Sequence, residues 1–403
     1  MRKGIISFEV ISDTHISTEA ECDSRAKLRN ALESIKRNYP EVAVIINAGD
    51  FTEDGSEESV SAYFGILSQY DEEFSFLTAL GNHDVRWQSG GWEEVYQRYM
   101  KYNSKYMGET NGKVYFHKKI AGYHFIVLNT EWEVKDRTFI SQKQLDWLDA
   151  TLAEVSKERK PIFVVNHQSL YDSFKVKDDA YDEANIYGAF GAQDHAVKAI
   201  LRKYPQTILF SGHLHAGIGA TEVVHKNYGT LVNVPCLKYT SYGEPINGEL
   251  GYHVTVYEDE IHFDLRDYAN DRWIAEHSYT VSLDQKPCFA EEQLFASSQI
   301  TSTENIYTVE TTDHSAKITW SLPEVVSNKM EPAYVVMDGV IVEKIESGAT
   351  DVTLDKLAPN TTYSIFVVHR EKTIARNYRE VHEISFFTKG EGTDGLYEKS
   401  KVL

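Results

Sequence analysis

Five short apolar runs in the first 215 residues alternate with helical patterns, and each run is followed directly by polar residues. The runs are rich in Val, Ile and Phe and extend over residues 5–11, 42–47, 74–80, 161–165 and 207–210. Runs of this length predict strands that are buried on both faces of a sheet. Their carboxyl ends should meet at one sheet edge, and open sheets between helices bind ligands at that edge.

The polar groups that follow these runs contain metal-ligand residues. In chain order they are Asp13-Thr14-His15, Gly49-Asp50, Gly81-Asn82-His83-Asp84, Asn166-His167 and Gly212-His213-Leu214-His215. Two carboxylates, one amide and four imidazoles can hold two divalent cations, and one histidine is left over for proton transfer. If the backbone stays extended, Asp13 and His15 lie on one side of it, and so do His213 and His215.

Each of these groups is a weak signal when it is taken alone. A Gly-Asp pair after a strand, for example, is more often a turn than a ligand. Five such groups at successive strand ends are hard to explain as turns. The set therefore indicates a metal site that hydrolyses a phosphate ester.

The five groups resemble those of the calcineurin-like metallophosphoesterases. The resemblance implies an α/β (α+β) four-layer β-sandwich flanked by helices, with two metals at the sheet edge. It also implies the ligands: Asp13, His15 and His215 for one metal, Asn82, His167 and His213 for the other, and Asp50 as a bridge between them. Nitrogen and oxygen ligands without a thiolate favour Mn, Fe or Zn as the two divalent ions.

Two neighbouring cations can share a hydroxide that attacks phosphorus near neutral pH. Negative charge then builds on the leaving oxygen, which needs a proton. His83 is the candidate general acid because an imidazole titrates near neutral pH, and Asp84 is expected to fix its tautomer and raise its pKa. The alternative is a structural histidine at a turn.

The residues around the ligands are similar to the class III cyclic nucleotide phosphodiesterases. Purple acid phosphatases match less well, because their pattern has a tyrosine at the position of Glu53 and lacks a histidine at the position of His15. Many phosphodiesterase relatives carry a second histidine where this chain has Gln168. The resemblance implies a phosphodiesterase for cyclic nucleotides or similar small phosphodiesters. The alternatives are a phosphomonoesterase or nucleotidase, and a non-catalytic scaffold, for which eroded ligands would be expected.

Two further residues are candidate substrate contacts. Arg86 could reach a phosphate oxygen, although an arginine after a turn is more often an ion-pair partner at the surface. Tyr171 opens an irregular stretch, residues 171–187, which is expected either to arch over the site and stack on a base or sugar or to be a surface loop.

The formal net charge is -20, and no basic run occurs. Duplex DNA binding requires many contacts from cations, so we expect a small phosphate ester as substrate and no duplex nucleic acid. Cys22, Cys236 and Cys288 have no zinc-site spacing, and an odd number of cysteines gives no disulfide framework.

The pattern predicts a catalytic domain over residues 1–283, a linker over 284–300, a second domain over 301–389 and a flexible tail over 390–403. The second domain resembles a fibronectin type III module, a small all-β sandwich, through Ala316-Lys-Ile-Thr-Trp320 and the tyrosine-corner sequence Leu357-x-Pro359-x-Thr361-x-Tyr363. We expect this domain to serve as a packing or spacing module, with possible contacts to a protein or to the rest of the chain.

The first residues lead straight into a strand, with no apolar signal segment before it. No run is long enough to cross a membrane. We therefore expect a cytoplasmic protein, or the mature form of an exported one, since fibronectin-like modules are common outside cells.

Overall fold

The computed structural model describes most of the chain in two compact units. The first unit carries the elements up to β13, and the second carries the strands from β14 onward. The described residues are 3–18, 23–86, 88, 90–132, 136–171, 173–174, 190–191, 193–218, 220–226, 228–241, 245, 248–283, 307–321, 330–337, 340–371 and 378–390.

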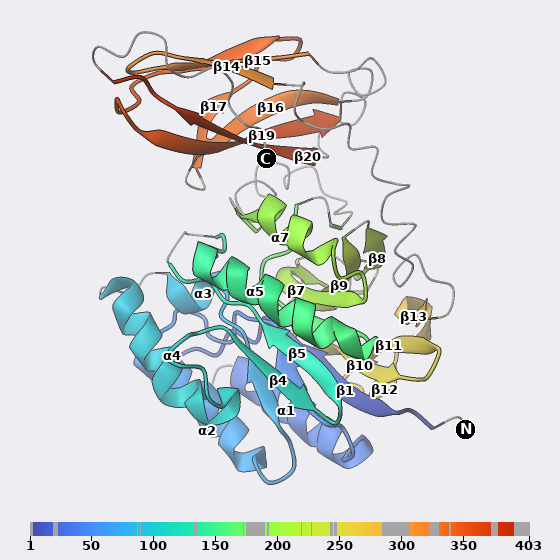
Figure 1. Ribbon diagram of the computed structural model, residues 1–403. Helices are drawn as coiled ribbons and strands as arrows, with labels where there is room; N and C mark the ends of the chain where they lie inside the picture. Colours follow the sequence, from blue (N-terminus) through green and yellow to red (C-terminus); the bar gives the residue numbers. More distant parts are fainter. Residues whose placement is uncertain are drawn as a thin grey trace. The chain divides into compact units, whose positions relative to one another are not determined.

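The first unit contains two mixed sheets (Figure 1). One has the order β12-β11-β10-β1-β2-β3, with β13 paired to β11. In this sheet β1, β2 and β3 are parallel, and β10 runs antiparallel to β1. Its strands are β1 (Ile6–Ile11), β2 (Ile45–Asn47), β3 (Phe76–Thr78), β10 (Leu250–Val256), β11 (Glu260–Asp267), β12 (Arg272–Trp273) and β13 (Tyr279–Ser282).

The other sheet has the order β4-β5-β6-β7-β9-β8. Its central strands β5, β6, β7 and β9 are parallel, and an antiparallel strand closes each edge. Its strands are β4 (Phe116–Ile120), β5 (Tyr123–Val127), β6 (Ile162–Val165), β7 (Thr207–Ala216), β8 (Val223–Lys226) and β9 (Gly229–Pro235).

The five predicted strands are all present, but they are divided between the two sheets. Strands β1, β2 and β3 belong to the first sheet, and β6 and β7 belong to the second. The sandwich implied by the family resemblance is therefore confirmed, whereas a single sheet edge is wrong. The apolar pattern could not separate the two arrangements, because a strand is buried on both faces in either one.

Aromatic side chains fill the space between the two sheets. Phe8 of β1 packs against Phe125 and Phe163 of the other sheet, with ring centroids 5.3 and 4.7 Å apart. All three side chains are fully buried. Such aromatic pairs stabilise a core beyond the area that they bury, so this contact fixes the spacing of the sheets.

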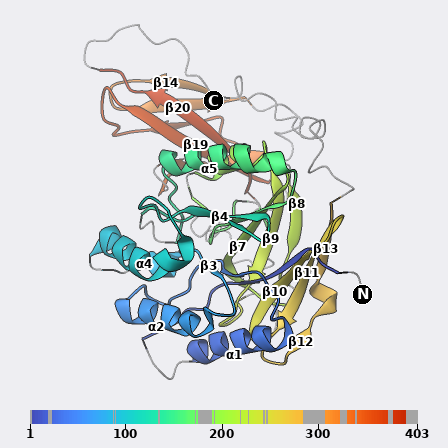
Figure 2. The same cartoon turned by 60° about the horizontal axis from the view of Figure 1, so that its bottom comes forward.

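Helices cover the outer faces of the sandwich, with α1 and α2 on the side of β1–β3 and α5 on the side of β4–β9 (Figure 2). In α1 the buried residues Leu28, Leu32 and Ile35 recur at helical spacing. Ser141 caps α5 by accepting a bond from Gln144 N. The helices are α1 (Asp23–Asn38), α2 (Glu57–Leu67), α3 (Asn82–Val85), α4 (Gly91–Met107), α5 (Gln142–Val155) and α7 (Asp194–Leu201), with 3-10 turns at Ser68–Tyr70, Ser156–Glu158 and Ala275–His277.

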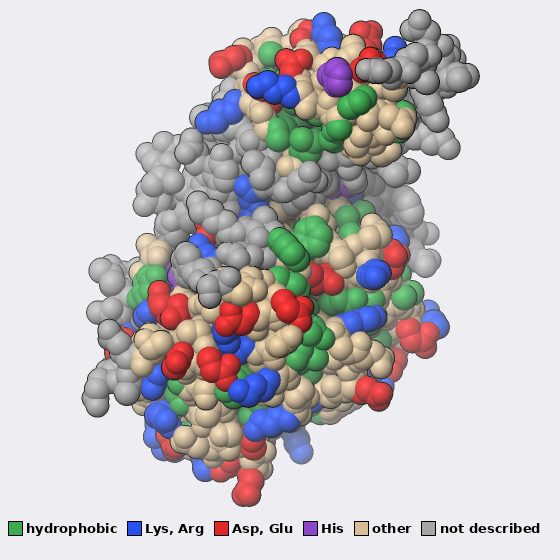
Figure 3. All heavy atoms as spheres, turned by 90° about the vertical axis from the view of Figure 1, so that its left-hand side faces the viewer, with side chains coloured by type: hydrophobic (Ala, Val, Ile, Leu, Met, Phe, Trp, Pro, Cys, Tyr) green, Lys and Arg blue, Asp and Glu red, His purple; other side chains and the backbone are tan. Residues whose placement is uncertain are grey.

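Acidic and basic side chains are interspersed on the described surface drawn in Figure 3. Lys101 pairs with Glu57 at 2.5 Å, and Lys105 pairs with Asp71 at 2.6 Å. Within the described ranges, no helix has both the length and the apolar character needed to cross a membrane.

The second unit has two sheets, a three-stranded one in the order β14-β15-β18 and a four-stranded one in the order β17-β16-β19-β20. Trp320, Val335 and Ile365 belong to its core. The backbone N–H of Ala358 donates to the hydroxyl of Tyr363 at 2.7 Å. The predicted linker, and the predicted tail beyond residue 390, lie outside the described residues. The strands are β14 (Tyr307–Thr311), β15 (Ala316–Trp320), β16 (Met330–Met337), β17 (Val340–Lys344), β18 (Asp351–Leu354), β19 (Thr362–Glu371) and β20 (Tyr378–Phe387).

Candidate functional site

Apart from Asn82, the structure brings the predicted ligands together in two groups that share Asp50. The ligand atoms within each group lie within 4.8 Å of one another. His15 Nε2 is 3.0 Å from His215 Nε2, and His167 Nε2 is 3.1 Å from Asp50 Oδ2. One group contains Asp13, His15, Asp50 and His215, and the other contains Asp50, His167 and His213.

Two buried atoms of the predicted ligands for the second metal have no hydrogen-bond partner among the described residues. His167 Nδ1 donates to the carbonyl of Ala48 at 2.9 Å, because a carbonyl only accepts. When the ring is neutral, His167 Nε2 therefore presents a lone pair toward the Asp50 carboxylate, and this atom has no hydrogen-bond partner among the described residues. The same is true of Asn82 Oδ1. Acceptors that face one another need a proton or a cation between them, so these residues fit a metal ion.

The pKa values indicate a site that attracts positive charge. Burial lowers the pKa of His167, but the carboxylates of Asp50 and Asp13 outweigh it and raise the pKa to about 9. Burial and the neighbouring His167 together lower the pKa of His213 to about 3. His213 is thus a neutral ligand, whereas the pocket around His167 holds a positive charge.

The backbone is left-handed at several of these positions, which is rare for residues other than glycine. These residues are Asp13, His15, Asp50, His213 and His215, with φ between 45 and 70°. The expectation of an extended Asp-x-His and His-x-His is therefore wrong. Left-handed backbone at five of the predicted ligands changes the direction in which their side chains project, and strained backbone of this kind clusters at functional sites.

Two glycines permit this close approach. A Cβ on Gly212 would lie 1.8 Å from Ser12 Oγ, and one on Gly81 would lie 2.2 Å from Asp50 Oδ1. Any side chain at either position would push two ligand loops apart. The glycines of both motifs are thus explained by packing between loops.

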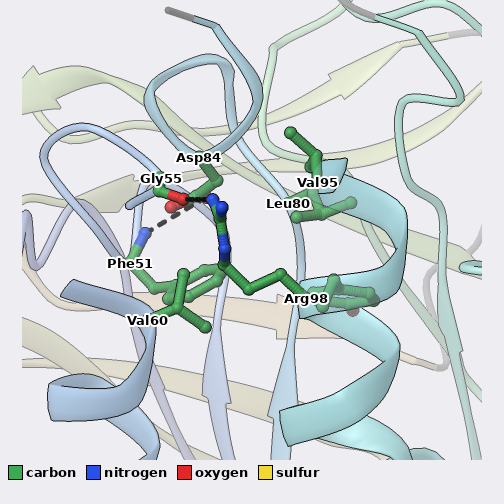
Figure 4. A pocket seen from close by; sticks show the side chains of 8 residues that line it. Phe51, Gly55, Val60, Leu80, Asp84, Val95 and Arg98 are labelled. Carbon is green, nitrogen blue, oxygen red and sulfur yellow. Dashed lines mark hydrogen bonds between the residues drawn. The ribbon is translucent and has the colours of Figure 1, made fainter. Parts of the chain in front are cut away.

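Asp84 differs from its expected role. Its carboxylate accepts bonds from Thr52 N at 2.8 Å and Gly81 N at 2.8 Å. It also accepts a bond from Phe51 N at 3.3 Å (Figure 4). Burial and the nearby Asp50 raise the pKa of Asp84 to about 8. Asp84 therefore connects the loop of Asp50 to the loop of Asn82 and does not orient His83.

A cavity of about 10 Å³ lies behind Asp84 and is lined also by Val60, Val95 and Arg98 (Figure 4). The Arg98 guanidinium donates to the carbonyl of Gly55. A volume of this size is close to that of one water molecule. The Asp50 loop is therefore backed by a small cavity with a mainly apolar lining, to which Asp84 and Arg98 contribute the charged groups.

The ring of His83 is bound on both sides. Nδ1 donates to the carbonyl of Glu53 at 2.8 Å, and Nε2 faces Arg86 Nη2 at 3.0 Å. Its ring centroid lies 4.6 Å from that of His15. His83 thus borders the first ligand group, and Glu53 and Arg86 fix its tautomer.

Glu53 and Lys238 were not assigned roles from the sequence. Glu53 Oε2 lies 3.4 Å from His15 Nδ1 and 2.6 Å from Lys238 Nζ. Burial raises the pKa of Glu53, but His15 and Lys238 outweigh it and lower the pKa to about 2. The position of Glu53, three residues after Asp50, was a usable signal, whereas Lys238 belongs to no motif.

The two candidate substrate contacts have other partners. Arg86 forms an ion pair with Asp136, which agrees with the ion-pair alternative. Tyr171 is 6 % exposed, and its carbonyl accepts a bond from Lys198 at 2.7 Å. Most of the stretch predicted to arch over the site lies outside the described residues.

Comparison with known proteins gives three findings. Residues 6–217 match the protein family described as calcineurin-like phosphoesterase. A probable cyclic nucleotide phosphodiesterase of Rhodopseudomonas palustris is 24 % identical over 219 residues, which are 53 % of this chain and 73 % of that protein. The fold is shared with a dimetal phosphatase from Danio rerio, which is 13 % identical with a TM-score of 0.53 over 70 % of this chain and 100 % of the other. It is also shared with a purple acid phosphatase from seeds of yellow lupin, Lupinus luteus, which is 15 % identical with a TM-score of 0.51 over 69 % of this chain and 53 % of the other.

Proposed function

The chain belongs to the calcineurin-like phosphoesterase family, and from this membership we propose that it hydrolyses small phosphodiesters, such as cyclic nucleotides, at a dinuclear metal centre. The family supports a hydrolase that acts on phosphate esters. The observation that carries the proposal is the pair of ligand groups that share Asp50.

We assign Asp13, His15 and His215 to one cation and Asn82, His167 and His213 to the other, with Asp50 between them. When bound, two divalent cations lower the pKa of water and stabilise negative charge on a phosphoryl group. Mn, Fe or Zn suits this set of nitrogen and oxygen ligands.

His83 is the proposed general acid. In the structure its Nε2 accepts from Arg86, so its ring is neutral there. To donate a proton to the leaving oxygen, Nε2 must first be protonated and Arg86 must turn away from it. We propose that Arg86 binds a phosphoryl oxygen while it keeps its ion pair with Asp136.

A diester is favoured over a monoester by the charges at the border of the site. The cation of Lys238 is paired with Glu53, and that of Arg86 with Asp136. A monoester dianion carries one more negative charge than a diester, and these two pairs leave little to stabilise it. The relative from Rhodopseudomonas palustris supports the same substrate class. A phosphomonoesterase remains the second candidate.

The test compares bis-p-nitrophenyl phosphate with p-nitrophenyl phosphate as substrates of the full chain in added manganese. A higher kcat/KM for the diester is expected. A preference for the monoester would establish the second candidate. If neither is hydrolysed while the protein retains two metal ions, the reading of a non-catalytic scaffold would replace both.

We further propose that residues 301–389 form a fibronectin type III-like domain that serves as a packing or spacing module. The three- and four-stranded sheets and the bond from Ala358 to Tyr363 support this assignment. Duplex nucleic acid is an improbable substrate for this chain because of its net charge of -20 and the interspersed charges in Figure 3.

A further inference from the structure

Tyr239 lies directly against the first ligand group. Its ring centroid is 4.5 Å from that of His215 and 6.0 Å from that of His15. The residue is nevertheless 37 % exposed, whereas His15 and His215 are buried. An aromatic ring that is open to solvent therefore stands beside two proposed metal ligands.

The backbone holds Tyr239 in a fixed place. Leu237 N donates to Ser12 O at 2.9 Å, and Ser241 N donates to His215 O at 2.9 Å. Tyr239 N itself contacts Cys236 Sγ at 3.4 Å. The segment is thus hydrogen-bonded to two of the loops that supply the first ligand group, at Ser12 and at His215. Because the ring is already held in place, it loses little conformational entropy when a ligand packs on it.

The chemistry of the surrounding surface suits a planar, uncharged group. The hydroxyl of Tyr239 has no hydrogen bond to the described residues. Its ring contacts the imidazole of His215 and lies 5.6 Å from Lys238 Nζ, and the part of the ring that is open to solvent is available to a planar ligand. The neighbouring Lys238 and Glu53 are paired with each other at 2.6 Å, so they add little net charge beside the ring. A second anionic group would gain little here, whereas a ring could stack on Tyr239.

The position relative to His83 indicates which end of the substrate meets the ring. His83 and Tyr239 both border His15, at centroid distances of 4.6 and 6.0 Å. A leaving oxygen protonated by His83 would therefore belong to a group bound beside His15, a residue that Tyr239 also borders. We propose that Tyr239 determines specificity by stacking on a planar ring, such as a nucleobase, of the leaving group; this inference rests on the proposed function.

The first test measures binding and needs no turnover. Manganese-loaded full-length protein is titrated calorimetrically with adenosine 5′-monophosphate and with ribose 5-phosphate, which lacks the base. Tyr239→Ala should weaken binding of the nucleotide by about tenfold, the range of one stacked base, and leave the affinity for ribose 5-phosphate within about twofold. Tyr239→Phe, which keeps the ring, should match the wild type with both ligands.

The outcomes separate stacking from a structural role. If Tyr239→Ala weakened the binding of both ligands equally, or if the variant lost manganese, Tyr239 would merely shield His215, and the proposal would be overturned. Unchanged nucleotide binding would overturn it as well. As a second readout, Tyr239→Ala should raise KM for a 3′,5′-cyclic nucleotide more than it changes KM for a dialkyl phosphodiester that contains no ring. Absence of diester hydrolysis in the wild type would refute the proposed function, but the binding result would still decide the role of Tyr239.

Discussion

At the scale of single residues, the clearest feature is a set of buried acceptors that face one another. His167 Nε2 and Asp50 Oδ2 lie 3.1 Å apart although neither is a donor when His167 is neutral. The raised pKa of His167 shows that a proton can occupy this place. A divalent cation would replace that proton, so metal binding should release protons and weaken as the pH falls.

His167→Ala tests this assignment. Removal of the ligand should reduce kcat/KM by more than about 100-fold, the upper range for loss of an outer-shell partner, and should lower the bound metal from two ions toward one. Metal analysis of the purified variant together with bis-p-nitrophenyl phosphate hydrolysis measures both effects. His262→Ala, a partly exposed histidine that pairs with Glu260, is the matched control. Full metal content in His167→Ala would contradict the assignment.

His83→Ala should behave differently, because His83 is proposed to move a proton and to hold no metal. Both ions should be retained, and kcat should fall by about 10²–10⁴-fold on diesters with alkoxide leaving groups. The loss on p-nitrophenyl esters should be much smaller, since p-nitrophenolate leaves without a proton. An equal loss on the two substrate classes would argue against the general acid role.

The sequence was sufficient to select candidate site residues whose chemistry is rare at a strand end. It was insufficient to assign a role to residues whose contacts depend on the fold. Six of the seven proposed ligands lie in two groups that share Asp50, and their assignment to metal ions stays a prediction. Asp84 was misassigned because adjacency in sequence to His83 did not reveal that its carboxylate turns back to Thr52 and Gly81. Tyr239 lies beside His215 only because residues 236–241 attach to two ligand loops, and no motif records that attachment.

At the scale of elements, the strands were predictable from apolar runs, but their pairing was not. Strand β10, far along the chain, inserts beside β1 and completes the first sheet. Apolar runs record burial and give no information on the neighbouring strand. The ligand loops therefore converge from two sheets, and contacts such as those of Asp84 are needed to hold the loops together.

The β4–β5 hairpin carries a pH-dependent contact away from the ligand groups. His117 Nε2 lies 2.8 Å from His124 Nδ1, and His124 Nε2 lies 3.0 Å from Glu158. Burial and then the neighbouring His124 lower the pKa of His117 from 6.5 to about 4. Between these values the unfolded chain binds more protons than the folded one, so the free energy of unfolding should fall as the pH drops from 6.5 to 4.

The lowered pKa of His117 corresponds to a change of at most about 3 kcal/mol in the free energy of unfolding, and partial solvent exposure of His117 will reduce this change. His117→Asn removes the titrating group, so its urea midpoint should fall less than that of the wild type over this pH range. Parallel pH profiles for the two proteins would show that His117 makes no contribution.

At the scale of the whole molecule, the described residues form separate cores. The change in sequence pattern near residue 301 led us to expect a second domain there, and its bounds stay a prediction. The second unit buries its own set of residues, among them Trp320, Ile318 and Ile384. The strand order of its sheets could not be derived from alternation alone, because alternation fixes which face is buried and leaves the partner open.

Trp320→Ala tests whether the second unit is needed for hydrolysis. Trp320 is 7 % exposed, and its ring centroid lies 6.4 Å from that of Tyr307. Truncation of a buried tryptophan costs about 3–5 kcal/mol, which is a large part of the stability of a small domain. Calorimetry should therefore show one unfolding transition shifted to lower temperature and another unchanged.

Hydrolysis of bis-p-nitrophenyl phosphate by Trp320→Ala should stay within about twofold of the wild type, because all proposed ligands lie in the first unit and no site residue is drawn from β14–β20. Val342→Ala, at a position that is 37 % exposed in the same unit, should alter neither transition. If activity were lost together with the fold of the second unit, a spacing role would be excluded. The second unit would then be part of the catalytic assembly, because unfolding one independent core cannot change chemistry in another.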